Sequence, residues 1–332
     1  MDRQVCSSFN ILHRYNQEDW FGKEGGETEK GKQELVFLCT KNQHIKNQRK
    51  IMAKKTIHIN GEPKEVYEIR KKILDSFGDL VFIDEGHKYY LNGVEIPSVT
   101  NVVKQFEHEE DWDLIAERYA LKHGETAEYW QDKWKYNNLR ATTTGTLVHE
   151  FGESMAWLKN GHPELITQSC RSKYVSDKGW LIPTRGKEEA IVKFWNDVPD
   201  CYHFILAETK VYSNKNPEFQ TKQQYCGTFD WNMYYKHPVD DSKSGIIIFD
   251  YKTNKDIAND YARANGKYLT APFGDMVEEP LSVYTLQLSA YQIPLEDIGL
   301  RVIGRKIIWL KDDGTYEKID LPDKTKELRE VL

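Results

Sequence analysis

The sequence predicts an α+β protein whose C-terminal half has the element order αβββαβ. Two helical patterns, near residues 188–198 and 281–291, enclose three consecutive strand-like runs. Short connections between strands are typical of an antiparallel meander, which we expect here. The three runs read FILAETKVYS, YCGTFDWNMYY and GIIIFDYKT.

Two more strands are expected after the second helical pattern. The run RVIGRKIIWLK is apolar enough for a buried strand, and residues 316–319 follow it after the turn Asp312–Asp313–Gly314. We therefore assign residues 141–332 to one core domain.

The N-terminal part is expected to contain a polar appendage, residues 1–53, and a hairpin and helical region, residues 54–140. The appendage has no sustained period of 2 or 3.6 and carries a lysine-rich run from Lys41 to Lys50. The runs IHINGEPKEV and LVFIDEGHKYYLNGVEIPSVTNVV alternate apolar and polar residues around Asn-Gly and Glu-Gly pairs, which predicts hairpins of a small sheet.

A helical region follows the small sheet. Residues 111–157 are rich in Trp, Tyr, Glu and Lys with helical spacing. Within them, Thr142–Thr143–Thr144–Gly145 resembles an N-cap, so we expect a helix to begin there.

Composition excludes several protein classes. No run approaches the roughly 18 apolar residues that span a bilayer, and residues 1–30 have no apolar core of a signal peptide, so we expect a cytoplasmic location without a membrane partner. The 5 cysteines have no C-x-x-C spacing, which argues against a disulfide framework or a zinc site. The net charge of −6 neither indicates nor excludes nucleic-acid binding.

The chemistry-bearing residues gather in the strand runs. Asp250 and Lys252 are two apart in GIIIFDYKT, so they project from one face of a strand and Tyr251 from the other. Asp230 ends the preceding run GTFD, and neighbouring strands can bring both aspartates together. Two carboxylates suit Mg²⁺ or Mn²⁺, and a lysine beside them can orient or deprotonate a water for phosphodiester hydrolysis. An isolated D-x-K also fits a surface ion pair.

Other candidates carry open alternatives. His149, with Glu153 one turn further along the same predicted helix, is a plausible metal ligand or a histidine bound to a neighbouring carbonyl or carboxylate. Glu208 is an acid within an apolar strand run, and it equally fits the outer face of an edge strand. Gln287 and Tyr291 lie four apart on one helix face, suiting a DNA backbone, a catalytic lysine, or a buried mutual hydrogen bond.

Taken in order, these elements resemble the RecB-like exonuclease branch of the PD-(D/E)XK nuclease superfamily. That pattern is GxxxH, Glu, GxxD, DxK and QxxxY, and here it reads GTLVH, the acid of ILAETK, GTFD, DYK and QLSAY. The resemblance spans about residues 140–310. It implies a restriction-endonuclease-like αβββαβ core, with a mixed central sheet flanked by helices.

The resemblance also implies roles for single residues. Asp230, Asp250 and the Tyr251 carbonyl would bind the metal together with His149, and Lys252 would be the catalytic lysine. Glu208 would support the metal region or a second ion. Gln287 and Tyr291 would steady the lysine and the substrate strand.

The cofactor and substrate expectations follow from the same likeness. No cysteine follows Cys226, so the iron–sulfur cluster of some relatives is not expected. The likeness is to compact stand-alone exonucleases of phage or mobile-element type, which implies DNA ends as substrate and a recombination or replication protein as partner. An endonuclease on the same core and a non-catalytic DNA-binding protein are the alternatives. The segment between Thr253 and Pro280 carries Tyr261, Tyr268 and Phe273 with basic residues, which suits a single strand or a lid packing its own aromatics.

Overall fold

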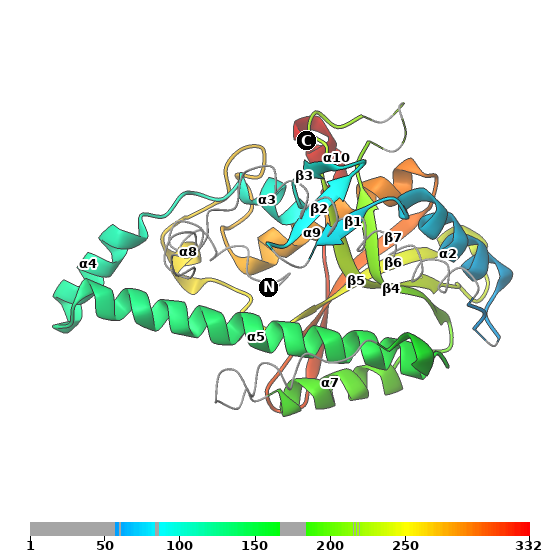
Figure 1. Ribbon diagram of the computed structural model, residues 1–332, viewed down its shortest axis with the longest axis horizontal. Helices are drawn as coiled ribbons and strands as arrows, with labels where there is room; N and C mark the ends of the chain where they lie inside the picture. The colour runs from blue at the N-terminus through cyan, green and yellow to red at the C-terminus, as the bar shows by residue number, and fades with distance from the viewer. Residues whose placement is uncertain are drawn as a thin grey trace, which may run out of the picture.

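The computed structural model describes residues 57–332 apart from 60, 84–85, 167–183, 215, 217 and 219. The expected appendage, residues 1–53, lies outside the described residues. The described part is a mixed α+β molecule with a three-stranded antiparallel sheet and a five-stranded mixed sheet, as Figure 1 shows. Among these residues, no helix is long and apolar enough to cross a membrane.

The N-terminal elements form the small sheet and the helices around it. They are α2 (Lys64–Phe77), β1 (Val81–Ile83), β2 (Lys88–Leu91), β3 (Val94–Ile96), α3 (Val99–Lys104), α4 (Trp112–His123), α5 (Ala127–Lys159) and the 3-10 turn η2 (Pro163–Leu165).

The predicted hairpin chemistry is confirmed for the second run and wrong for the first. β2 and β3 are joined by Asn92–Gly93, whose φ angles of 51° and 82° suit a tight hairpin turn that glycine and asparagine tolerate. The run IHINGEPKEV instead leads into α2, which begins directly after Pro63. Proline favours the start of a helix, and the buried residues of α2 recur at helical spacing, so the 3.6-residue period prevails there.

Helix α5 is longer than expected. The prediction that a helix begins at Thr142–Gly145 is wrong, because α5 runs unbroken from Ala127 and is capped by Thr126, whose hydroxyl accepts from Tyr129 N. The threonine hydroxyls donate to carbonyls of their own helix instead of capping it, with Thr143 Oγ1 2.7 Å from the Leu139 oxygen. The helix therefore passes through residues 140 and 141, where the core domain was expected to begin.

The C-terminal elements follow the order expected for a three-stranded meander, a helix and a further strand. They are α7 (Arg185–Asn196), β4 (Tyr202–Tyr212), β5 (Cys226–Tyr235), the 3-10 turn η3 (Asp241–Lys243), β6 (Gly245–Lys252), α8 (Asp260–Ala264), α9 (Pro280–Asp297), β7 (Val302–Leu310), β8 (Tyr316–Asp320) and α10 (Thr325–Val331).

The larger sheet has the strand order β4-β5-β6-β7-β8. The pairs β4/β5, β5/β6 and β7/β8 are antiparallel, while β6 and β7 are parallel and are connected through α9. Helices α5 and α7 pack against one face of this sheet, where Tyr251 contacts Trp195 of α7. Helix α9 packs against the other face, where Lys252 contacts Gln287. Central strand β6 is buried along its whole length.

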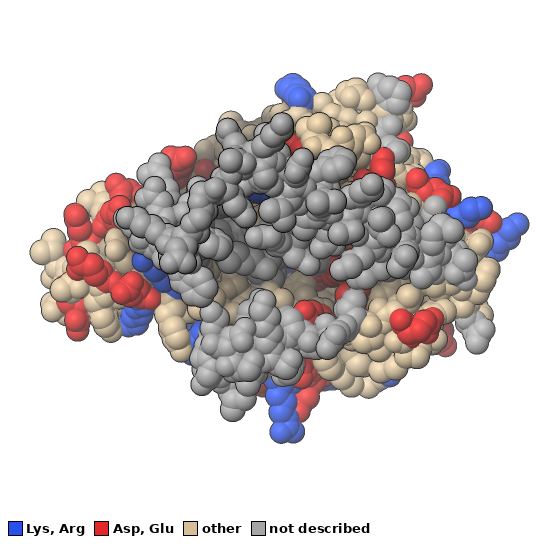
Figure 2. All heavy atoms as spheres, in the orientation of Figure 1, with Lys and Arg blue, Asp and Glu red and all other residues tan. Residues whose placement is uncertain are grey.

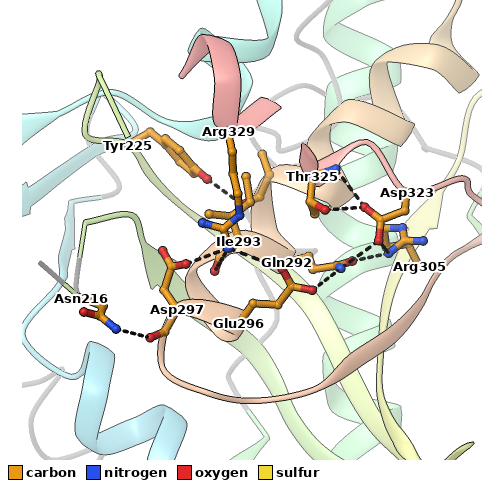
Figure 3. Close-up of polar contacts among 11 residues, drawn as sticks. Asn216, Tyr225, Gln292, Ile293, Glu296, Asp297, Arg305, Asp323, Thr325 and Arg329 are labelled. Carbon is orange, nitrogen blue, oxygen red and sulfur yellow. Dashed lines mark hydrogen bonds and ion pairs between the residues drawn. The ribbon is translucent and has the colours of Figure 1, made fainter. Parts of the chain in front are cut away.

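Helix α9 is held in a fixed rotation by polar contacts at its C-terminal half, drawn in Figure 3. Gln292 and Arg305 of β7 both donate to Asp323, each at 3.1 Å. Arg329 of α10 lies 2.7 Å from Asp297 Oδ1 as an ion pair. Almost every residue from Ser282 to Asp297 is buried, and these contacts restrain the C-terminal half of the helix.

A close approach of α5 to the sheet requires glycine at position 152. A Cβ added to Gly152 would lie 2.3 Å from Tyr251 Cε2. We expect Gly152→Ala to lower the free energy of unfolding by about 1–3 kcal/mol, because overpacking outweighs the better helix propensity of alanine. Urea denaturation measures this change. Gly274→Ala is the control, since its Cβ would meet only the Leu269 oxygen at 3.8 Å. Equal stability of both variants would contradict the overpacking argument.

Candidate active site

The site forms where strands β5 and β6 separate. Their ladder runs from Tyr235↔Gly245 to Trp231↔Phe249 and stops there. Both strands continue beyond it, β5 through residues 226–230 and β6 through residues 250–252. Here the two strands no longer pair with each other, although β5 still pairs with β4 and β6 with β7. We call these two stretches the fork. Asp230 and Asp250 are the first residues of the fork, one on each strand.

Asp230 replaces one hydrogen bond that the ladder no longer makes. Its Oδ2 accepts from the backbone N–H of Tyr251 at 2.7 Å, so the backbone of β6 remains satisfied where pairing ends. Its Oδ1 lies 2.8 Å from Nδ1 of His149, which enters from α5. Since an ionised carboxylate only accepts, Nδ1 of His149 donates, and a neutral imidazole then has its lone pair on Nε2. The structure thus brings His149 and Asp230 into direct contact.

Asp250 and Lys252 face the same side of β6, as the strand period predicts. Lys252 Nζ lies 2.6 Å from Asp250 Oδ2, and the two side chains are 1% and 3% exposed. The contact is an ion pair between a buried ammonium and a buried carboxylate. Burial and the neighbouring charge of Asp230 raise the pKa of Asp250, while Lys252 and His149 oppose this rise. Burial lowers the pKa of Lys252, but Asp250, Tyr284 and Asp230 together outweigh this effect and the net pKa is raised.

Helix α9 positions the lysine. Gln287 Oε1 lies 3.5 Å from Lys252 Nζ, and Gln287 Nε2 donates to the Tyr291 hydroxyl at 3.3 Å. Both residues are buried, so the contacts join them to the lysine and to each other. The two interpretations of this pair, support of a lysine and a mutual hydrogen bond, are therefore both present in the structure.

One contact to the lysine was missed by the sequence reasoning. Lys252 Nζ lies 4.1 Å from the ring centroid of Tyr284, and the Tyr284 hydroxyl donates to Asn254 at 2.7 Å. A cation over an aromatic face is stabilised, most strongly when both are out of water. The sequence contained a pattern that could have indicated this contact, because Tyr284 is three residues before Gln287 and shares its helix face.

The glycine of GTFD has a steric role in the fork. A Cβ on Gly227 would lie 2.6 Å from Cε1 of Tyr291. Glycine therefore allows the tyrosine ring to lie directly against β5, and this contact joins two of the sequence elements that carry the resemblance.

Glu208 lies opposite the fork on β4. The register pairs Ala207 with Trp231 and Thr209 with Phe229, so Glu208 stands at the level of Asp230. Its φ of 53° is unusual for a non-glycine residue within a strand. Such strained backbone concentrates at functional sites, but sequence patterns do not reveal it.

The donor set fits a hard divalent cation. Asp230, Asp250 and the main chain of Tyr251 offer oxygen ligands, which Mg²⁺ and Mn²⁺ prefer. Two buried carboxylates adjoin one lysine and one histidine, so an additional positive charge would offset their repulsion. In the described part of the chain, no three His, Cys, Asp or Glu side chains already form a metal-binding group. A cation here would be held by these two carboxylates and the backbone oxygen, with Nε2 of His149 as a further candidate ligand.

The chain matches no family model and no curated protein in our comparisons. Assignment therefore depends on the five sequence elements and on the contacts among them.

The charge balance of the fork gives a stability prediction. Lys252→Met removes the cation beside two buried carboxylates, and we expect a loss of about 3–5 kcal/mol in the free energy of unfolding in EDTA. The double variant Asp250→Asn/Lys252→Met should recover a large part of this loss, because the carboxylate left unpaired is removed as well. Chemical denaturation of the wild type, the two single variants and the double variant provides a double-mutant cycle. Strictly additive effects would show that the two charges are not coupled.

Proposed function

We propose that this protein is a metal-dependent deoxyribonuclease of the RecB-like PD-(D/E)XK type that hydrolyses DNA from single-strand or duplex ends. The proposal depends above all on the fork, where Asp230, Asp250 and Lys252 meet in a buried cluster with His149 and Gln287. The αβββαβ core of the restriction-endonuclease-like fold is part of this proposal, supported by the strand order and the parallel β6/β7 pair.

The residues have separable roles in such a reaction. Hydrolysis adds a water oxygen to phosphorus, breaks one P–O bond and gives a proton to the departing oxygen. Asp230, Asp250 and the Tyr251 carbonyl would hold Mg²⁺ or Mn²⁺, which when bound lowers the pKa of water and stabilises charge on phosphate. Lys252 supplies a fixed positive charge to the phosphate and a group that orients the attacking water.

The remaining residues hold this arrangement. His149 orients the Asp230 carboxylate through its 2.8 Å contact, and in the proposed function it is a further metal ligand. Gln287 and Tyr284 restrict the lysine, because two contacts from one rigid helix leave it few rotamers, and Tyr291 holds Gln287 in place by a hydrogen bond. Glu208 supports the metal region from the neighbouring strand.

Burial of so much charge argues against a purely structural role for the fork. Lys252 is fully buried at the end of an apolar strand, and such a group costs free energy that an apolar residue would not. In a non-catalytic DNA-binding protein, nothing in the function would require this free-energy cost of burying a lysine. An endonuclease on the same core differs only in how the strand reaches the fork, so the substrate test separates it.

The activity test compares an end-labelled single strand, a blunt duplex and a covalently closed circle, each with Mg²⁺, Mn²⁺ or EDTA. We expect metal-dependent loss of the linear substrates while the circle survives, and Lys252→Gln should lose about a hundredfold or more. Lys318→Gln, an exposed lysine on β8, is the control and should match the wild type. Cutting of the circle would replace the exonuclease assignment with the endonuclease one. Absence of cleavage with retained DNA binding would support the binding protein.

Metal affinity gives a separate test of the carboxylates. Asp230→Asn and Asp250→Asn should each weaken Mn²⁺ binding at least tenfold, because each removes a negative oxygen ligand. Calorimetric titration measures this in the absence of DNA. Asp241→Asn, whose side chain is 81% exposed in η3, is the matched control. Unchanged affinity in both fork variants would rule out these carboxylates as the ligands.

A further inference from the structure

A helical arm projects from the body of the molecule (Figure 1). The arm consists of α4 and residues 127–141 of α5. The buried residues of α5 all lie from Thr142 onward, so this half of the helix contributes nothing to the main core. An isolated helix of this length is only marginally stable, and the arm therefore needs its own packing.

Aromatic side chains between the two helices supply that packing. Trp134 lies 5.9 Å from Trp112 and 5.4 Å from Tyr119, both in edge-on geometry. Trp130 joins the same group against Tyr119 and His123. The arm is thus a small aromatic-stabilised unit whose outer surface is left for other contacts.

That outer surface carries an alternation of aromatic and cationic side chains. Tyr129, Lys133, Tyr136 and Arg140 are spaced by four, three and four residues, which puts them on one face of α5. We call them the stripe. Tyr129 and Tyr136 are 45% and 51% exposed, and Lys133 and Arg140 are exposed as well. Lys133 Nζ lies 5.6 Å from the Tyr129 ring, and Arg140 lies 5.9 Å from the Tyr136 ring.

Exposed aromatic side chains occur in two segments of the described chain. Besides Tyr119, Tyr129 and Tyr136 of the arm, they are Tyr261 and Tyr268, which follow β6. The two segments are connected, because Thr270 N donates to the Phe106 oxygen at 2.8 Å and Lys267 pairs with Glu110 just before α4. Figure 1 shows α8 on the same side of the molecule as the arm. Phe273, by contrast, is buried against Phe106 and is not available to a ligand.

The charge on the arm distinguishes between kinds of nucleic acid. Figure 2 shows mainly acidic groups on the arm at the left, with a few basic ones and no broad basic patch among its coloured atoms. Duplex DNA is bound mainly through its phosphates and requires such a patch. Single strands also offer unstacked bases, which bind aromatic rings with little sequence preference. Beside the stripe, Asp132 is paired with Lys135 at 3.6 Å, which reduces its repulsion of phosphates.

We propose that the stripe binds single-stranded DNA, with its tyrosines stacking on bases and its two cations contacting phosphates. This deepens the proposed function and rests on it for the reaction, since it makes a strand with unpaired bases the substrate of the fork. The same helix carries the stripe and His149. Arg140 lies about 14 Å from His149 along the axis and on the opposite side of the helix, because nine residues make about two and a half turns. The stripe therefore engages nucleotides remote from the scissile bond.

Binding in EDTA tests the stripe without cleavage. Fluorescence anisotropy of labelled oligothymidylate, about 20 nucleotides long, gives the affinity of the full-length chain, and a blunt hairpin duplex is the comparison. Tyr129→Leu/Tyr136→Leu should weaken single-strand binding about tenfold per ring, while Tyr129→Phe/Tyr136→Phe stays within about twofold. Lys133→Gln and Arg140→Gln should each reduce the salt slope by about 0.7. Leu121→Ala, 88% exposed on α4 outside the stripe, is the control.

The outcomes separate the two proposals. Wild-type affinity in the double leucine variant, or an equal loss for duplex and single strand, overturns the stripe. If linear DNA is not cleaved but the leucine variant still loses single-strand binding, the nuclease proposal fails and the stripe stands. If linear DNA is cleaved but the leucine variant binds single strands as the wild type does, the stripe proposal fails and the nuclease proposal stands. Circular dichroism of each variant verifies that the arm remains helical.

Discussion

The end of the β5/β6 ladder at Trp231 and Phe249 is the constraint on which the rest of the site depends. Where two paired strands separate inside a protein, backbone N–H groups between them lose their partners. A buried N–H without a partner is costly in free energy. Asp230 removes that cost at Tyr251, which ties a carboxylate to the point of separation. The same carboxylate then fixes His149 of α5. The hydrogen bond that the Tyr251 N–H requires thus places the Asp230 carboxylate where it also contacts the His149 imidazole.

The buried lysine explains why α9 is so completely enclosed. An ammonium out of water requires partners on several sides, and α9 supplies an amide oxygen and an aromatic face in addition to the Asp250 carboxylate. Those partners are useful only if the helix cannot rotate. The contacts of Gln292, Arg305 and Arg329 at its far end provide this restraint (Figure 3). The polar network and the lysine are parts of one arrangement, although they share no atoms.

Sequence periodicity predicted the elements whose patterns come from burial. The runs of apolar residues predicted the three meander strands and the helices α7 and α9. The two-residue period of a strand predicted that Asp250 and Lys252 share one face. Sequence patterns gave a wrong prediction where one residue type is compatible with two local structures. Threonine caps helices and also bonds back within them, so Thr142 concealed the true start of α5. The strained φ of Glu208 and the place where a ladder stops are tertiary properties, without a local pattern to reveal them.

The arm has a different relation to the fold than the fork has. Every change in the fork disturbs buried charges, whereas residues 127–141 of α5 lie outside the core. Substitutions on the exposed face of the arm are consequently close to neutral for folding. Changes on this surface can therefore accumulate without passing through unstable intermediates, so the arm and the fork can diverge at different speeds.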